Sequence, residues 1–305
     1  MSDLTCFYEA QLVLWQDVKQ RFNDLQHIRI RSLGKLKAQF NPSRMISTGA
    51  KIDRFIIEKR PCFLCAVNRP KEQIVKSFNS HFDILINPFP ILPKHFTIPS
   101  IRHEPQQIKN SFIEMLLFVE EYAEEIVFYN GPFCGASAPD HLHFQAVPKM
   151  ILPVYENWKA LAKTSEEVIF REDAKVLYVN DYVCPLIAIT GLNINSIVFL
   201  FNKIYKELPL PEGNVEPMMN VISWKEKDLF VTLIFPRLKH RPDCYYGKYT
   251  EQCLVSPGAI DMGGLIILPR REDFETITPL QATSILKEVT LTSEDVEKVL
   301  SQLKK

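Results

Sequence analysis

The stretch that decides the fold of this chain is His141-Leu142-His143-Phe144-Gln145. Polar and apolar residues alternate along it, and alternation at a period of two is the spacing of a β-strand. The two histidines and the glutamine should therefore project from one face, and the two apolar residues should pack in the core. A core strand has little use for two imidazoles and an amide in a row, so the pattern favours an active site that attacks a phosphate. The alternative is a pair of surface histidines on an edge strand.

His143 is the candidate nucleophile of this strand. A neutral imidazole attacks phosphorus well, and the phosphoramidate that it forms is reactive enough to pass the group on. The attack requires an acceptor for the other ring nitrogen, so that the attacking nitrogen keeps its lone pair. Gln145 can donate an amide N–H to a phosphate oxygen, and Gly135-Ala136-Ser137 in the preceding loop offers backbone N–H groups and a hydroxyl.

The segments on either side of this strand alternate between strand and helix. Residues 81–87, 95–99 and 126–129 have the composition of short strands, and residues 104–123 carry apolar side chains at helical spacing. Further upstream, we expect a helix over 7–28 and an irregular basic segment over 29–51.

The same order recurs in the second half of the chain. We expect strands at 176–180, 185–190, 220–224 and 229–235, with a helix between the second and third. Leucine, valine and leucine at positions 229, 231 and 233 stand where the first copy has its histidines and glutamine.

This repetition predicts a tandem duplication of the α+β class. Antiparallel sheets with helices packed on them are expected, with a catalytic half at 1–160 that includes the helical lead-in. A degenerate half is expected at 161–305, and its last helix spans 291–303. The alternative is two unrelated α+β segments that happen to have the same order of strands and helices.

Composition limits the class of protein. The 305 residues are 46% hydrophobic and 24% charged, which is ordinary for a globular chain long enough for two domains. Lysine plus arginine equals aspartate plus glutamate at 36 each, so the chain lacks the positive field of a nucleic-acid-binding protein. No apolar run approaches the roughly 20 residues that span a bilayer, and residues 1–6 resemble no secretion signal. We expect a cytoplasmic protein without nucleic-acid or membrane partners, whose seven cysteines are thiols or metal ligands.

Cys62 and Cys65 form a C-x-x-C pair, which is half of a tetrahedral zinc site. His103 and His141 are the best candidates for the other half, and a metal there would stiffen the start of the catalytic strand. His95 is the rival third ligand, although a structural role at a proline-bounded bend suits it better. The alternative is two buried thiols in a turn without a metal.

Four further residues are candidate ligands of a nucleotide. Asn87 ends a strand and can bind ribose hydroxyls, and Asn130 opens the glycine-containing loop with the same possibility. Asparagine at such places is commonly turn chemistry, which is the alternative for both. Arg44 and Lys51 lie in the basic segment and can hold phosphates, or they can belong to a solvated charged face.

The 141–145 stretch resembles the HxHxQ signature of the transferase branch of the histidine-triad (HIT) superfamily. That branch includes hexose-1-phosphate uridylyltransferases, diadenosine tetraphosphate phosphorylases and GDP-hexose phosphorylases. Residues 83–99 are similar to the strand, turn and strand of this superfamily, and 135–137 resemble its phosphate-binding loop. The resemblance covers about residues 41–150 and implies a HIT-like fold with a degenerate second repeat.

The resemblance also implies roles for the site residues. His143 would become nucleotidylated, His141 would support the strand and bind zinc, and Asn87 would contact ribose. Gln145 stands where the hydrolase branch has a third histidine. An amide can hold a phosphate but cannot shuttle a proton near neutral pH, so the glutamine favours transfer over hydrolysis.

The implied activity is that of a nucleotidyltransferase or phosphorylase with a covalent nucleotidyl-histidine intermediate. The substrate would be a nucleotide diphospho-sugar or a dinucleoside polyphosphate, and the acceptor orthophosphate or a sugar 1-phosphate. Structural zinc is expected, no organic cofactor is expected, and the chain would be a monomer or a homodimer. The alternatives are a HIT-type nucleotide hydrolase and a non-catalytic nucleotide-binding protein.

Overall fold

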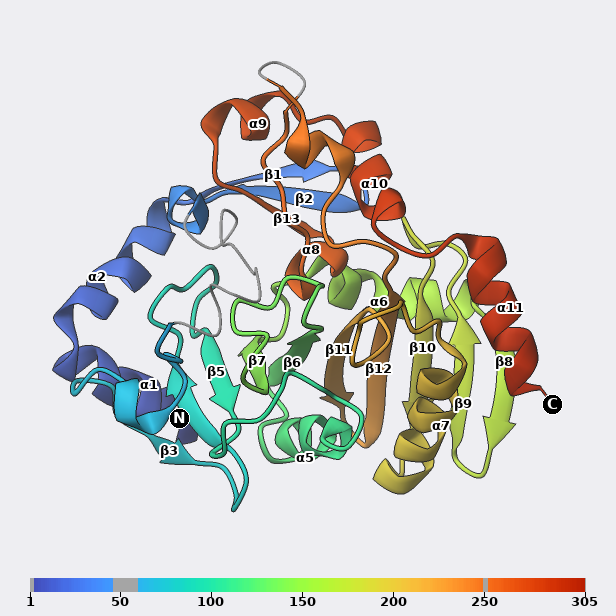
Figure 1. Ribbon diagram of the computed structural model, residues 1–305, viewed down its shortest axis with the longest axis horizontal. Coiled ribbons are helices and arrows are strands. Elements are labelled where there is room, and N and C mark those ends of the chain that lie inside the picture. The colour runs from blue at the N-terminus through green and yellow to red at the C-terminus, as the bar shows by residue number, and fades with distance from the viewer. Residues whose placement is uncertain (1–2, 46–59, 249–251, 305) are drawn as a thin grey trace.

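A computed structural model of the protein describes residues 3–45, 60–248 and 252–304. These residues form a ten-stranded sheet, a three-stranded sheet and helices on both faces of the large sheet (Figure 1). The predicted α+β class is confirmed. No helix in the described part of the chain is long and apolar enough to cross a membrane.

The large sheet is antiparallel throughout. In spatial order its strands are β3 (Lys76–Ser77), β4 (Asp83–Ile86), β5 (Phe96–Pro99), β7 (His143–Pro148), β6 (Glu125–Asn130), β11 (Met219–Glu226), β12 (Leu229–Pro236), β10 (Ile187–Gly191), β9 (Ala174–Tyr178) and β8 (Glu166–Arg171). The first five strands form one unit and the last five form a second, with the same internal order read from each edge inward. The two units meet at β6 and β11, where Asn130 lies opposite Asn220. This arrangement confirms the tandem duplication and shows that the two copies join into one continuous sheet.

Strands β7 and β12 occupy the same place in their units, and both end in proline, at Pro148 and Pro236. Aligned on these prolines, Gln145 and Leu233 are equivalent. The flanking registers agree, because each of these residues lies between a partner in the third strand of its unit, in chain order, and a partner in the fourth. The partners are Thr97 and Phe128 for Gln145, and Ala188 and Ile222 for Leu233.

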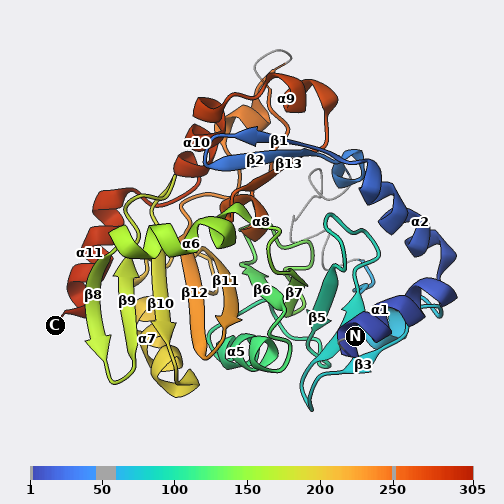
Figure 2. The ribbon, with the colours of Figure 1, turned by 180° about the vertical axis from the view of Figure 1, so that it is seen from behind.

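The two faces of the large sheet bury separate hydrophobic cores. One core is formed with α1 (Asp3–Leu14), α2 (Gln16–Asp24), α5 (Phe112–Glu121), α7 (Ile194–Glu207) and α11 (Ser293–Leu303). The other core is formed with α6 (Pro153–Thr164), α8 (Ala259–Met262), α9 (Arg271–Thr276), α10 (Pro279–Glu288) and the small sheet. Figure 2 shows α6 in front of the second unit and α7 behind it, so the two helices cover opposite faces.

Residues 29–40 of the basic segment do not have the irregular structure that the sequence predicts, and residues 46–51 lie outside the described residues. Residues 29–40 form a hairpin of β1 (Arg29–Leu33) and β2 (Leu36–Phe40), and β13 (Leu265–Leu268) pairs with β2 in parallel. A lysine within β2 and arginines within β1 interrupt the apolar pattern, and the strand that completes the sheet comes from the far end of the chain. The local sequence could not show that partner.

Two predicted helices have different bounds in the structure. The lead-in is two helices, because Trp15 between α1 and α2 has a non-helical backbone, with φ −124° and ψ 85°. Residues 104–111 form a loop, and α5 begins only at Phe112. The C-terminal helix agrees with its prediction, since Thr292 caps α11 by accepting from the Asp295 N–H at 3.2 Å.

Candidate active site and metal cluster

His143 is the first residue of β7, and its ring lies on the face opposite α5. Leu142 and Phe144 are buried in the core on the α5 side, as predicted. The Nδ1 atom of His143 lies 2.8 Å from the carbonyl oxygen of His141, so Nδ1–H donates and the lone pair remains on Nε2. Burial lowers the pKa of His143 to about 4, which keeps the ring neutral at pH 7. This is the protonation state that a nucleophile toward phosphorus requires.

Gln145 is oriented by His95. The Ile91 N–H donates to Nδ1 of His95 at 3.4 Å, which places the proton of the neutral ring on Nε2. Burial, together with the charge of Arg44, lowers the pKa of His95 to about 3. The Nε2–H of His95 donates to Oε1 of Gln145 at 2.8 Å, and the Asn87 amide lies 3.5 Å from the same oxygen. Because Oε1 faces these donors, the amide N–H groups of Gln145 are directed away from them and can serve a ligand.

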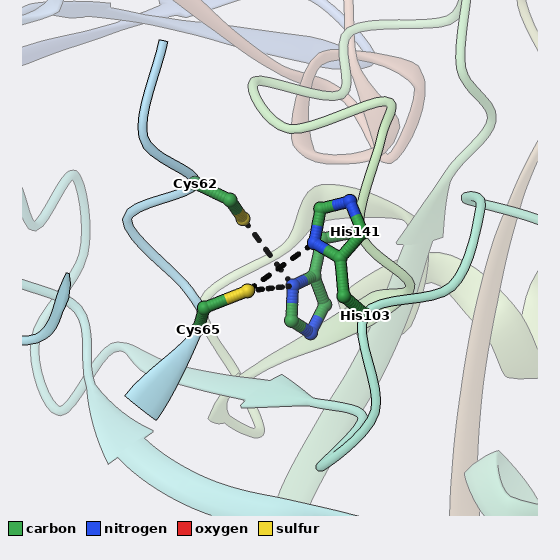
Figure 3. A group of neighbouring side chains, drawn as sticks. All are labelled: Cys62, Cys65, His103 and His141. Carbon is green, nitrogen blue, oxygen red and sulfur yellow. Dashed lines mark hydrogen bonds between the residues drawn. The ribbon is translucent and has the colours of Figure 1, made fainter. Parts of the chain in front are cut away.

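Cys62, Cys65, His103 and His141 form a cluster that can hold a metal ion (Figure 3). The four ligand atoms lie within 4.8 Å of one another, with Cys62 Sγ 3.3 Å from His141 Nδ1 and Cys65 Sγ 3.2 Å from His103 Nδ1. Two sulfurs and two nitrogens around zinc would be separated by roughly 3.3–3.8 Å. The Nε2–H of His141 donates to the Ser100 carbonyl at 2.8 Å, which leaves the Nδ1 lone pair facing the thiols.

The predicted four-residue cluster therefore exists as an arrangement of side chains. His95 is not part of it, since that ring binds Gln145 instead. His141 also lies just before β7 rather than within it, as the strand begins at His143. Because the His141 carbonyl holds Nδ1 of His143, one residue links the metal cluster to the candidate nucleophile.

The remaining predicted ligands do not all lie at this site. Asn87 lies beside Gln145, as described above. Arg44 lies in the short 3-10 turn Pro42–Arg44, close enough to the site for its charge to act on His95. Ser137 is exposed on the loop before β7, and Lys51 lies outside the described residues.

Asn130 joins the two units rather than facing an open site. Its Oδ1 accepts from the Asn220 amide at 2.8 Å and from the Ala259 N–H at 2.7 Å, at the start of α8. The Oδ1 of Asn220 in turn accepts from the buried guanidinium of Arg237. The sequence did not point to Asn220 or Arg237, because their roles depend on contacts between distant segments.

The ring of His143 is enclosed in this conformation, with 3% of the residue exposed. A cavity of about 430 Å³ lies near the same strand, but it is lined by residues such as Glu104, Leu142 and Tyr205, on the side of Leu142.

Two sequence families match the chain. Residues 7–148 match the family described as a domain of unknown function (DUF4922), and residues 160–305 match the family described as GDPGP1-like, C-terminal domain. No protein of curated function matches the chain.

Similar solved structures are those of the yeast Ap4A phosphorylase Apa2. Its complex with Ap4A has a TM-score of 0.61 and 14% identity, over 90% of this chain and 96% of that chain. Its complex with AMP has a TM-score of 0.61 and 16% identity, over 90% and 97% of the two chains. At these identities the likeness concerns the fold. The chain therefore shares the fold of these phosphorylase structures, and residues 160–305 match the family described as GDPGP1-like, C-terminal domain.

Proposed function

We propose that the protein is a nucleotidyltransferase of the phosphorylase kind that acts through a covalent nucleotidyl-His143. The observation that carries this proposal is the hydrogen bond from Nδ1 of His143 to the His141 carbonyl. That bond makes Nε2 a neutral nucleophile two residues from an oriented amide, that of Gln145. The fold supports the proposal, since the similar structures are of a phosphorylase, one with Ap4A and one with AMP.

The substrate class is a nucleotide joined through a diphosphate bond to a second group, such as a nucleotide diphospho-sugar or a dinucleoside polyphosphate. Nε2 of His143 attacks the α-phosphorus, a P–N bond forms, and the P–O bond to the second group breaks. The second group leaves as a phosphate anion with the electron pair of that bond. The His141 carbonyl stabilises the charge that develops on the ring, and the Gln145 amide donates to a non-bridging oxygen.

Orthophosphate or a sugar 1-phosphate completes the reaction. One of its oxygens attacks the same phosphorus, the P–N bond breaks, and neutral His143 is restored. Gln145 cannot act as a base for water in this step, so the intermediate persists until a phosphate acceptor arrives.

Labelling with a nucleotide substrate that carries ³²P at the α-phosphorus tests the nucleophile. We expect an acid-labile adduct on the unmodified protein and none on the His143→Ala variant. The His81→Ala variant is the matched control, because the His81 side chain is exposed and lies beside Glu114. A His143→Ala protein that is still labelled would mean that the nucleophile is another residue.

The Gln145→His variant tests the preference for transfer. A third imidazole can carry a proton to or from water, so hydrolysis should rise relative to phosphorolysis by about tenfold or more. Products are measured with and without added orthophosphate, using GDP-sugars, UDP-sugars, ADP-sugars and diadenosine polyphosphates as substrates. An unchanged ratio would contradict the role given to the Gln145 amide.

We further propose that the metal of the Cys62, Cys65, His103 and His141 cluster is zinc, bound for structure. Two thiolates and two imidazoles are the ligand set that zinc prefers in such sites. The ion would fix the ring of His141 and, through its carbonyl, the ring of His143. We expect one zinc per chain by elemental analysis and its loss in Cys62→Ser, whereas Cys6→Ser, at an exposed thiol, should retain it. A chain purified without zinc that cannot take it up would refute this assignment.

A further inference from the structure

The loop between β5 and α5 sends one side chain into the space between β6 and β7. This residue, Gln106, is fully buried. Its Oε1 accepts from the His143 N–H at 2.8 Å, and its Nε2 donates to the carbonyl oxygens of His143 and Asn130 at 3.0 Å and 2.9 Å. A single amide thus satisfies both main-chain groups of the candidate nucleophile.

The Gln106 amide replaces the main-chain hydrogen bonds that would otherwise join β6 to β7 at Asn130 and His143. The paired residues run from Glu125 opposite Pro148 to Phe128 opposite Gln145. Two residues further on, the same register would put Asn130 opposite His143, but the pairing has ended. In a regular ladder two opposite residues can exchange both N–H···O bonds directly. Here the Gln106 amide lies between them and bonds to both strands.

The opposite neighbour, β5, does not supply these bonds. The adjacent residue Leu142 accepts from the Ser100 N–H at 2.9 Å and donates to the Glu104 carbonyl at 2.7 Å, so its main chain faces β5. Successive residues of a strand direct their main-chain groups to opposite sides. The N–H and C=O of His143 therefore face β6, where Gln106 is the partner that they have.

Gln106 is itself held in place from several directions. Its own N–H donates to the Pro139 carbonyl at 3.3 Å. Two residues later, the Ile108 N–H donates to Oε2 of Glu216, at 3.0 Å, from the second unit of the sheet. The loop is thus tied to the glycine-containing segment before β7 and to the second half of the chain.

We propose that Gln106 is a positioning residue for the nucleophile, which sets the main chain of His143 and hence the place of Nε2. The inference rests on the proposed function, since positioning has a purpose only if His143 reacts. A displacement of about 1 Å in a reacting group can reduce a rate about 100-fold. Loss of the Gln106 amide should therefore lower the rate of the chemical step rather than weaken nucleotide binding.

The Gln106→Met variant tests the proposal, because methionine has a similar length and no hydrogen-bonding amide. Gln11→Met is the matched control. Gln11 is also fully buried, and its amide likewise bridges main-chain groups, accepting from the Ile74 N–H at 2.9 Å and donating to the Glu72 carbonyl at 2.7 Å. We expect Gln106→Met to lower kcat and the single-turnover rate of His143 labelling about 10- to 100-fold, with KM changed by less than about threefold.

Gln11→Met should lose a comparable amount of thermal stability and keep its kcat. If both variants lose activity only in proportion to the fraction that is unfolded, Gln106 has a structural role and the proposal is wrong.

A second readout does not depend on activity. The ring nitrogens of His143 give NMR signals that can be assigned by comparison with His143→Ala. We expect Gln106→Met to shift or broaden them, and Gln11→Met to leave them unchanged. Unchanged signals in Gln106→Met would overturn the proposal. Perturbed signals in a protein that is never labelled would refute the proposed function and leave the positioning of the ring supported.

Discussion

Strands β7 and β12 occupy equivalent places in the two units, yet only β7 carries groups suited to chemistry. The positions of His143 and Gln145 are taken by Val231 and Leu233, which are fully buried in the core that contains α6 and α8. The same backbone position can therefore hold a reactive imidazole in one unit and an apolar packing residue in the other. The comparison shows that the fold depends on the strand pattern, whereas the chemistry depends on a few side chains placed on it.

The second unit nevertheless contributes to the site. Asn220 and Arg237 hold Asn130 at the junction of the units, and Glu216 holds the loop that carries Gln106. The second unit, which has apolar residues at the equivalent positions, thus holds parts of the first unit in place.

The largest difference between the units should appear when equivalent residues are truncated. Removal of the nucleophile in His143→Ala should lower turnover by at least about 10⁴-fold, or about 5.5 kcal/mol in the barrier. Val231→Ala should leave turnover per folded molecule unchanged and lower the free energy of unfolding by about 2 kcal/mol, because two buried methyl groups are lost. Steady-state kinetics and urea unfolding of both variants measure these effects. Comparable losses of turnover in the two variants would contradict the assignment of chemistry to His143 and of packing to Val231.

Much of the catalytic unit could be predicted because its signals are local. The period-two pattern of 141–145 predicts β7, and helical spacing predicts α7. The C-x-x-C pair with His103 and His141 predicts the cluster, because such a pair is half of a tetrahedral zinc site.

The parts that the sequence did not predict depend on contacts between distant segments. Nothing in the neighbourhood of Gln106 distinguishes it from the exposed Gln107 beside it, and the hydrogen bonds to His143 appear only when the loop folds back. The pairing of β13 with β2 has the same cause. A histidine is a possible partner for a C-x-x-C pair, but the ring of His95 bonds to the Ile91 N–H and to Gln145 instead, and the local sequence does not show this.

The next largest contrast concerns the basic residues that follow the prolines, Lys149 after β7 and Arg237 after β12. Arg237 is buried, and its guanidinium donates to the side chain of Asn220 and to several main-chain carbonyls. Lys149 is partly buried, donates to the Lys225 carbonyl and pairs with the more exposed Glu226 carboxylate at 3.6 Å. Arg237→Met should therefore cost about 3–5 kcal/mol of unfolding free energy, because it leaves buried acceptors without donors.

Lys149→Met should cost less than about 1 kcal/mol, because water can replace the lost bond. Both values come from equilibrium unfolding in urea. Equal losses would mean that the Arg237 network does not stabilise the junction of the units.

The smallest contrast concerns two buried glutamates, Glu125 of the first unit and Glu216 of the second. Burial raises the pKa of each to about 7. Among the described residues, Oε2 of Glu125 has no hydrogen-bond partner. Both oxygens of Glu216 accept bonds, from the Tyr129 hydroxyl at 2.5 Å and from the Ile108 N–H at 3.0 Å. Ionisation is thus penalised in both glutamates, but the two hydrogen bonds described for Glu216 are ones that an amide would disrupt.

Since the folded pKa values lie above the unfolded value, the native state binds more protons than the unfolded state between about pH 4.5 and pH 7. Stability should fall as the pH rises through this range. Glu125→Gln removes the penalty and should raise the unfolding free energy at pH 8 by about 1–3 kcal/mol, with little gain at pH 5. Glu216→Gln should give no such gain, because its NH₂ group would face a donor. Urea unfolding at both pH values separates these cases, and an equal gain for Glu125→Gln at pH 5 and pH 8 would exclude the buried charge as its cause.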